Sequence, residues 1–233
     1  MSRNEVAGSN GGSVAIDGFV ASGKSTCAKA LAERLAYLYL DTGAMYRAVA
    51  FLALHNGVAV DQESALVALL QAHRVDVGMH DASPLGYSIR IDGKDVTQRL
   101  FDPEVTSAVS AVASQPAVRA SLVERQREIA REGPVVMAGR DIGTVVLPDA
   151  PYKFFLTASL EERARRRQNE LAERGVAVDF EELQVQIQER DRIDETRAIS
   201  PLRRATDAVL IDSTGMDAGA VVELMLATIR NAA

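Results

Sequence analysis

The ten residues DGFVASGKST, at positions 17–26, constrain this chain more than any other feature. They fit the phosphate-loop pattern G-x-x-x-x-G-K-[ST], with Gly18, Gly23, Lys24 and Ser25 at the fixed positions. An apolar run precedes the motif and an amphipathic stretch follows it, so a strand is expected to pass through a tight loop into a helix. The unpaired N–H groups and the positive dipole end of that helix would face an anion. The motif predicts an α/β domain that binds a nucleotide.

Within the loop, Lys24 is expected to reach the outer phosphates, and the Ser25 hydroxyl to ligand Mg²⁺. The residues expected to contact ATP are Gly18, Phe19, Val20, Ala21, Ser22, Gly23, Lys24, Ser25 and Thr26. A phosphate loop alone does not separate switches, motors and kinases. The guanine-specifying N-K-x-D sequence of GTPases is absent, and no predicted strand ends in the paired acids usual in motor ATPases.

Length and composition narrow the class of protein. With 233 residues, the chain is expected to form one large domain or a core with small inserted lobes. A formal net charge of −6 argues against a protein that mainly coats nucleic acid. The single cysteine, Cys27, excludes a disulfide framework, favours a reducing compartment and is expected in the core. Residues 1–12 are predicted to be a flexible polar tail rather than a signal peptide, and no apolar run is long enough to span a membrane. A cytoplasmic protein is expected.

Short apolar runs alternate with longer helical stretches, which is typical of a mostly parallel sheet with helices on both faces. Strands are predicted at 13–17 and 37–41, and helices at 24–35 and 43–57. Three more segments are predicted to be buried core strands: GPVVMAGRD, YKFFLTA and AVLIDS.

Two regions break this alternation. Residues 75–99, including VDVGMH, YSIRIDG and KDVTQRL, have the pattern of short antiparallel strands and predict a small inserted sheet. Residues 161–204 predict two charged helices that flank RGVAVD. Arginines and acids nearly cancel there, so the segment is not expected to be a nucleic-acid arm. It is interpreted as a mobile lobe with individually directed arginines.

The segment DTGAMYR, residues 41–47, follows a predicted strand at the sheet edge where open α/β sheets bind ligands. Tyr46 could offer an aromatic face and Arg47 a bidentate fork for phosphate. Alternatively, Tyr46 packs in the core and Arg47 is solvated. The pair alone leaves both interpretations open.

Six segments together make the function more specific: IDG…SGKST, LDTGAMYRAVA, PEVTSAVSAVASQPAVRASLVERQR, GRDIGTVVLPDA, FFLTASLEERARRR and ERDRID. In this order they resemble bacterial cytidylate kinases, over nearly everything from Ile16 to Ser213. The resemblance implies transfer of the γ-phosphoryl group of ATP to CMP or dCMP, with Mg²⁺, in a monomer that binds neither nucleic acid nor membrane.

The same resemblance implies a fold and a domain organisation. A P-loop NTPase-type parallel sheet is expected to be flanked by helices and to carry an inserted β-containing lobe for the monophosphate and a helical lid. Residues 13–233 would form a single kinase domain. Its expected parts are a core of about 13–60, 134–160 and 205–233, a monophosphate-binding lobe of about 61–133 and a lid of about 161–204.

The resemblance also assigns roles to residues. Arg47 and Arg140 would hold the α-phosphate of the acceptor. The base would be read by Thr42, Arg119, Asp141 and Arg197, and the sugar would be met by Ser110, Arg190 and Asp194. Tyr46 completes the expected substrate site. Arg166 would descend from the lid onto the transferring phosphoryl group and the phosphates of ATP, which adds it to the expected ATP-binding residues. The expected catalytic residues are Lys24, Arg140, Asp141 and Arg166.

Other interpretations of these charges stay open. Arg163, Arg165, Arg166 and Arg167 share a predicted helix with several glutamates, so surface pairs at helical spacing could explain most of them. ERDRID could be a solvated helix end. A kinase of another acceptor, such as a different monophosphate or shikimate, and a nucleotide-dependent switch without transfer activity are the competing functions.

The chain departs from the family pattern in two places. Phe19 and Ala21 stand where the family commonly has Pro and Gly. Because glycine there permits positive φ, Ala21 predicts an ordinary φ with its N–H still directed at phosphate. Thr42 stands where some members have serine and keeps the hydroxyl.

Overall fold

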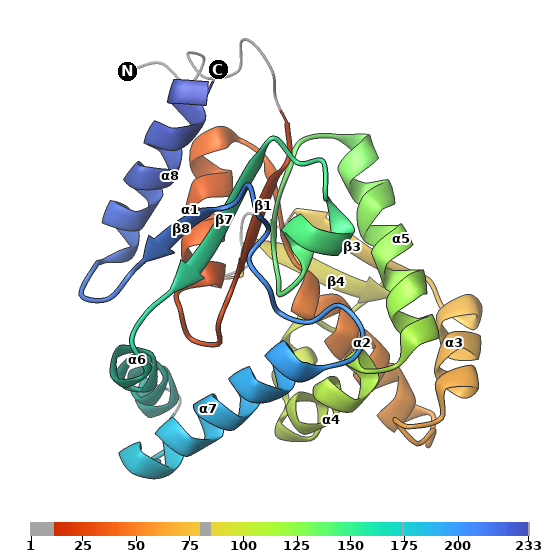
Figure 1. Cartoon of the computed structure of the whole chain (residues 1–233). Coiled ribbons are helices and arrows are strands. Elements are labelled where there is room, and N and C mark those ends of the chain that lie inside the picture. Colours follow the sequence, from red (N-terminus) through yellow and green to blue (C-terminus); the bar gives the residue numbers. More distant parts are fainter. Residues whose placement is uncertain (1–11, 80–84, 174, 233) are drawn as a thin grey trace. The chain divides into compact units, whose positions relative to one another are not determined.

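The computed structural model describes residues 12–79, 85–173 and 175–232, which form two compact units (Figure 1). The first unit contains the residues up to Tyr37 and those from Val136 onward, and the second unit contains Leu38–Val135. The predicted N-terminal tail lies outside the described residues except for Gly12. Within the described ranges, no helix combines the length and apolar composition that crossing a membrane would require.

A parallel sheet forms the centre of the first unit. Its strands are β1 (Val14–Gly18), β6 (Val135–Ala138), β7 (Tyr152–Thr157) and β8 (Val209–Asp212). β1 lies between β6 and β7, and β8 follows β7. β2 (Leu38–Asp41) falls among the residues of the second unit. Strands buried on both faces are expected to be continuously apolar, as β1 and β6 largely are.

One strand prediction is only partly right. The segment AVLIDS does form β8, but of its four strand residues only Ile211 is buried. Among the described residues β8 is the last strand in the order of the sheet, so no described strand pairs with one of its edges. Apolar content alone therefore overstated its burial.

One helix of the first unit begins and ends where the sequence predicts. α1 spans Lys24–Leu35, as predicted, and both flanking residues, Gly23 and Ala36, have left-handed backbones with φ of 88° and 57°. α1 packs against α8 (Ala218–Ala232) beside the sheet (Figure 1). A short π-helical turn, η2 (Ile142–Val146), follows β6.

The two predicted charged helices are α6 (Leu160–Glu173) and α7 (Phe180–Thr196), which pack together (Figure 1). The Asp179 side chain caps α7 by accepting the Glu182 N–H at 2.9 Å. The apolar residues between the helices include Ala164, Leu183 and Ile187.

The second unit is mainly helical. Its helices are α2 (Thr42–His55), α3 (Glu63–Ala72), the 3₁₀ helix η1 (Thr97–Phe101), α4 (Pro103–Ala113) and α5 (Pro116–Glu132). Proline opens both α4 and α5, at the one helical position where its missing N–H carries no cost. The predicted α/β fold, with a parallel sheet flanked by helices, is therefore confirmed.

The predicted inserted sheet is present in the second unit. β3 (Val75–Met79), β4 (Tyr87–Ile91) and β5 (Lys94–Asp95) pair antiparallel in that order. The two-residue turn Asp92–Gly93 has positive φ at both positions, which suits a tight hairpin. The expected strand KDVTQRL is only two residues long, because the Thr97 hydroxyl accepts the Ile89 N–H at 2.9 Å and the chain then turns into η1.

Candidate active site

The phosphate loop joins β1 to α1. Gly18 has a φ of 145°, and a Cβ there would lie 2.0 Å from the Leu156 carbonyl oxygen, so only glycine fits. The Lys24 ammonium donates to the Phe19 carbonyl, and Lys24 is buried. Ser25, in the first turn of α1, is exposed. The loop therefore combines a lysine folded over its own backbone with an accessible hydroxyl at a helix start.

Ala21 contradicts one expectation about this loop. Its φ is 56°, in the left-handed region, where an ordinary φ was predicted. The turn requires a left-handed backbone at this position whichever residue occupies it, and here an L-amino acid adopts that conformation. Such a conformation costs an L-residue roughly 1–2 kcal/mol. The loop thus keeps its turn at the expense of local strain.

Two arginines of α6 form surface ion pairs. Arg165 lies 2.6 Å from Glu161 and 3.0 Å from Glu162, and Arg167 lies 2.7 Å from Glu170. These partners are three or four residues away on the same helix. For Arg165 and Arg167 the structure favours the interpretation as surface pairs.

Arg166 is directed at the phosphate loop instead. Its guanidinium donates to the Ser22 carbonyl at 3.3 Å and to the Ser213 carbonyl at 2.6 Å, and Glu162 accepts from its Nε at 2.9 Å. Its charge also acts on Cys27 in α1. Burial raises the pKa of the Cys27 thiol to about 11, and Arg166 partly offsets this rise. Cys27 is a buried core residue, as predicted.

Arg163, which was not among the predicted site residues, also reaches the loop. It forms a buried ion pair with Asp191 of α7 and donates to the Val20 carbonyl at 3.3 Å. Arg165, Arg166 and Arg167 each have an acid three or four residues away on α6, whereas Arg163 has none, so this spacing was a signal that could have set Arg163 apart. Asp191 carried no signal beyond its place in ERDRID.

Asp17, at the end of β1, is a second functional candidate that the sequence analysis missed. Its carboxylate accepts the N–H groups of Ile142 and Gly143 at 2.8 and 2.7 Å. Burial raises its pKa to about 6, with a smaller rise from Asp141, while the two N–H donors and Lys24 act in the opposite direction. Asp17 therefore ties the strand that enters the phosphate loop to the turn that follows the GRD segment. A charge at the end of a buried strand was the available signal.

Four predicted acceptor-site residues belong to one charge network in the first unit. Arg140 Nε lies 2.7 Å from an Asp194 oxygen, and Arg197 lies 3.6 Å from Asp141 and 3.9 Å from Asp194. All four side chains are at most 20% exposed. Arg190, one turn before Asp194 on α7, is half-buried. Two cations and two carboxylates thus alternate, a pattern suited to a ligand with both donors and acceptors.

The other predicted acceptor residues lie in the second unit. Thr42 and Tyr46 are buried and one turn apart on α2, and the Arg119 guanidinium lies 5.4 Å from the centre of the Tyr46 ring. Arg47 is half-buried, 5.3 Å from the centre of the Phe101 ring. Tyr46 therefore packs inside, as one interpretation held, while Arg47 is not simply solvated.

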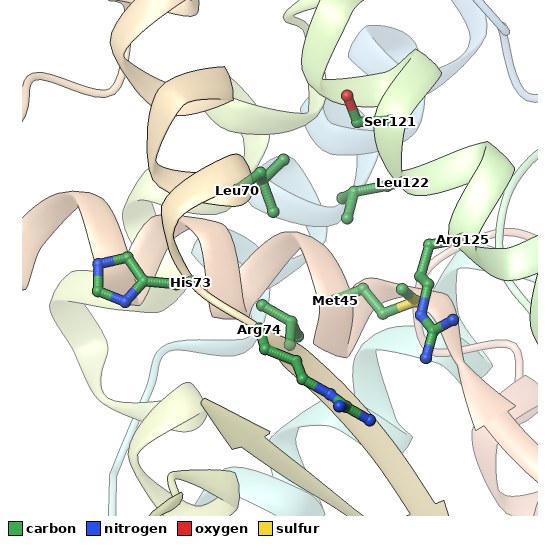
Figure 2. Close-up of a pocket in the computed structure, with 8 residues that line it drawn as sticks. Met45, Leu70, His73, Arg74, Ser121, Leu122 and Arg125 are labelled. Atoms are coloured by element: carbon green, nitrogen blue, oxygen red, sulfur yellow. The ribbon is translucent and has the colours of Figure 1, made fainter. Parts of the chain in front are cut away.

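A pocket of about 360 Å³ also lies in the second unit (Figure 2). Its lining residues are Met45, Leu70, His73, Arg74, Val75, Ser121, Leu122 and Arg125. None of the predicted substrate residues is among them, and Ser110, on α4, is exposed. The Arg74 Nε lies 2.8 Å from Asp76, so this cation already has an acidic partner.

Comparisons with known proteins agree with these features. The family model described as cytidylate kinase matches residues 14–231. A cytidylate kinase of Geobacillus sp. (strain WCH70) is 49% identical over 213 residues, covering 91% of this chain and 94% of the relative. One of Enterococcus faecalis (strain ATCC 700802 / V583) is 49% identical over 219 residues, covering 94% of each chain.

A solved structure supports the fold alone. It is that of an uncharacterized protein from Eubacterium ventriosum ATCC 27560, with a TM-score of 0.54 at 14% identity, covering 95% of this chain and 99% of that one. The family assignment rests on the sequence matches, which extend over nearly the whole chain. This chain belongs to the cytidylate kinase family.

Proposed function

We propose that this chain transfers the γ-phosphoryl group of ATP to CMP or dCMP, giving ADP and CDP or dCDP. The observation that supports it best is the bond between Asp17 and the turn after Asp141. Through it the strand that enters the phosphate loop is joined to the segment that carries Arg140 and Asp141. In this proposal, the donor site and part of the acceptor site would be fixed to one another within the first unit.

The donor ATP would lie against the phosphate loop. Lys24 and Arg166 donate to the neutral carbonyls of Phe19 and Ser22. Hydrogen bonds to charged phosphate oxygens are roughly twice as strong as those to neutral acceptors. Both cations would therefore exchange these carbonyls for phosphate oxygens when ATP binds.

Mg²⁺ fits the residues at the start of α1. Ser25 supplies an accessible hydroxyl oxygen, and Mg²⁺ prefers oxygen ligands completed by waters and substrate phosphates. We infer that Ser25 is its protein ligand. When bound, the ion would neutralise charge on the donor phosphates.

The acceptor would be bound by arginines, carboxylates and hydroxyl groups. Arg47 and Arg140 would bind its phosphate. The residues proposed to read the cytosine edge are Thr42, Arg119, Asp141 and Arg197, and those proposed to contact the sugar are Ser110, Arg190 and Asp194. Tyr46 would give the site an aromatic wall. Cytosine offers one amine donor and two acceptors, so a carboxylate and arginines match its edge.

Phosphoryl transfer mainly requires alignment and positive charge. The attacking oxygen of the acceptor is already an ionised phosphate oxygen, so no side chain has to act as general base. We assign residues 161–204 the role of a lid and residues 61–133 the role of a monophosphate-binding lobe, in a monomeric, cytoplasmic enzyme.

An acceptor panel tests this proposal. With ATP and Mg²⁺, coupled ADP release is measured for CMP, dCMP, UMP, AMP and shikimate. We expect CMP and dCMP to be the preferred acceptors, and millimolar CMP to raise the unfolding temperature. A strong preference for a non-pyrimidine acceptor would overturn the assignment. Slow hydrolysis of ATP without transfer to any acceptor would indicate a switch module.

A further inference from the structure

Arg163 of α6 and Asp191 of α7 contact both backbone polar groups of Val20, in the middle of the phosphate loop. Arg163 Nη1 donates to the Val20 carbonyl at 3.3 Å, and the Val20 N–H donates to Asp191 Oδ1 at 3.4 Å. The same Nη1 donates to Asp191 Oδ2, while Arg163 Nε is anchored on the Ala158 carbonyl at 3.1 Å. Side chains from both α6 and α7 therefore hydrogen-bond to the backbone of Val20.

The same helices hold the side chains of this part of the loop. The Arg163 guanidinium lies 5.2 Å from the centre of the Phe19 ring, in a cation–π contact. The Val20 side chain packs against the apolar cluster of α6 and α7 made by Ala164, Leu183 and Ile187. The unusual Phe-Val filling of the loop thus gives α6 and α7 an apolar and aromatic surface to pack against.

The charges of the pair matter because of where they lie. The side chains of Arg163 and Asp191 are each only 9% exposed. A carboxylate with no counter-ion, beside a loop that binds phosphates, would repel an anionic ligand, and its burial would leave little solvent to screen it. Arg163 makes the pair neutral overall.

We propose that Arg163 and Asp191 are positioning residues of the ATP site. They fix the backbone of the phosphate loop at Val20 from the two lid helices, and Arg163 cancels the carboxylate charge next to the phosphates. This inference rests on the proposed function, because it takes ATP as the ligand of the loop.

The test compares Arg163→Met, Asp191→Asn and the double variant with the full-length wild type. KM for ATP, KM for CMP and kcat are measured, together with the Kd of ATP in the presence of Mg²⁺ by calorimetry. Arg163→Met leaves the carboxylate unpaired, so KM for ATP should rise about tenfold or more while KM for CMP changes less than about twofold. Asp191→Asn removes the carboxylate and so leaves no unpaired negative charge beside the loop. It should raise KM for ATP less than about threefold.

The double variant separates charge from mere structure. It leaves neither charge buried, so it should recover at least about fivefold of the loss in ATP affinity seen in Arg163→Met. It also carries the test if Arg163→Met does not fold. A double variant that binds ATP no better than Arg163→Met would contradict the proposal. If Arg163→Met does not fold, a double variant that binds ATP ten times more weakly than Asp191→Asn would contradict it.

Arg165→Met is the matched control, since Arg165 lies on the same helix but pairs with the exposed acid Glu161. It should change neither the Kd nor the KM of ATP. The proposed function and the role of Arg163 can be refuted separately. A wild type that binds ATP but transfers nothing to CMP would refute the proposed function. An active wild type with unchanged ATP affinity in Arg163→Met would refute this inference.

Discussion

The carboxylate of Asp17 accepts the N–H of Gly143 at 2.7 Å, so an acid at the end of β1 holds the start of η2. Its other oxygen accepts the Ile142 N–H at 2.8 Å. Both donors are N–H groups at the start of a helical turn, where the helix dipole favours a negative charge. The group is nonetheless only 4% exposed, and burial outweighs these donors in its pKa.

The first prediction concerns pH and Asp17. Its pKa is raised from 3.8 to about 6, so the folded state binds the proton more tightly than the unfolded state. The stability it contributes is present below about pH 4 and is lost as the pH rises through about 6, by about 3 kcal/mol. Urea unfolding of the wild type and Asp17→Asn between about pH 4 and 7 should show the wild type losing about that much relative to the variant. A difference that does not change with pH would contradict this.

The second prediction concerns the entry of the phosphate loop. In Gly18→Ala the new Cβ would meet the Leu156 carbonyl at 2.0 Å, with φ at 145°, so backbone must move. We expect a loss of more than about 3 kcal/mol in the free energy of unfolding. Gly57→Ala is the control: its φ is 64° and its Cβ would meet no heavy atom within 4 Å. It should lose only about 1–2 kcal/mol, and equal losses in the two variants would count against the clash.

The third prediction concerns the strained alanine. Ala21→Gly removes a left-handed L-residue, a gain of roughly 1–2 kcal/mol, but adds about 0.4–1 kcal/mol of unfolded-state entropy. The free energy of unfolding should therefore rise by up to about 1.6 kcal/mol. Ala36→Gly, at φ 57° after α1, is the matched control and should behave alike. A loss at position 21 beside a gain at position 36 would mean that the Ala21 methyl makes stabilising contacts.

The fourth prediction concerns Lys24. If its ammonium leaves the Phe19 carbonyl for the phosphates, Lys24→Ala should lower kcat by roughly 10²-fold or more. Lys29→Ala, on the same helix and 3.8 Å from Glu33, should leave kcat nearly unchanged. Steady-state kinetics with ATP and CMP give both values. Near-normal turnover in Lys24→Ala would remove the lysine from the mechanism.

The sequence predicted the elements better than their surroundings. α1 was placed at its observed bounds because the motif fixes its first residue and the apolar period its length. The burial of β8 was wrong because an apolar run does not reveal whether a neighbouring strand will cover it. The φ of Ala21 was wrong because residue type was weighed above the geometry of the turn.

For the candidate site, the sequence indicated which residues carry charge but not which partner each would choose. Arg163 and Arg165 are two positions apart in one arginine run, yet one contacts the phosphate loop and the other its own helix. Arg165 has acids three and four residues before it on α6 and Arg163 has none, but the partner of Arg163, Asp191 of α7, is a tertiary contact that the sequence does not reveal. Arg140 and Asp194 form an ion pair although 54 residues separate them, and nothing in the sequence indicated this pairing.

The burial of Cys27 has a practical consequence for observing this enzyme. With a pKa of about 11, its thiol is almost wholly protonated near neutral pH and is only 2% exposed, so thiol-directed dyes should not react with it. Since the chain has one cysteine and no tryptophan, a tryptophan introduced at the exposed Val185 of α7 would be the only tryptophan, and a cysteine introduced there would be the one thiol that a dye labels readily. In the native sequence, neither tryptophan fluorescence nor labelling of Cys27 would interfere with a signal from position 185.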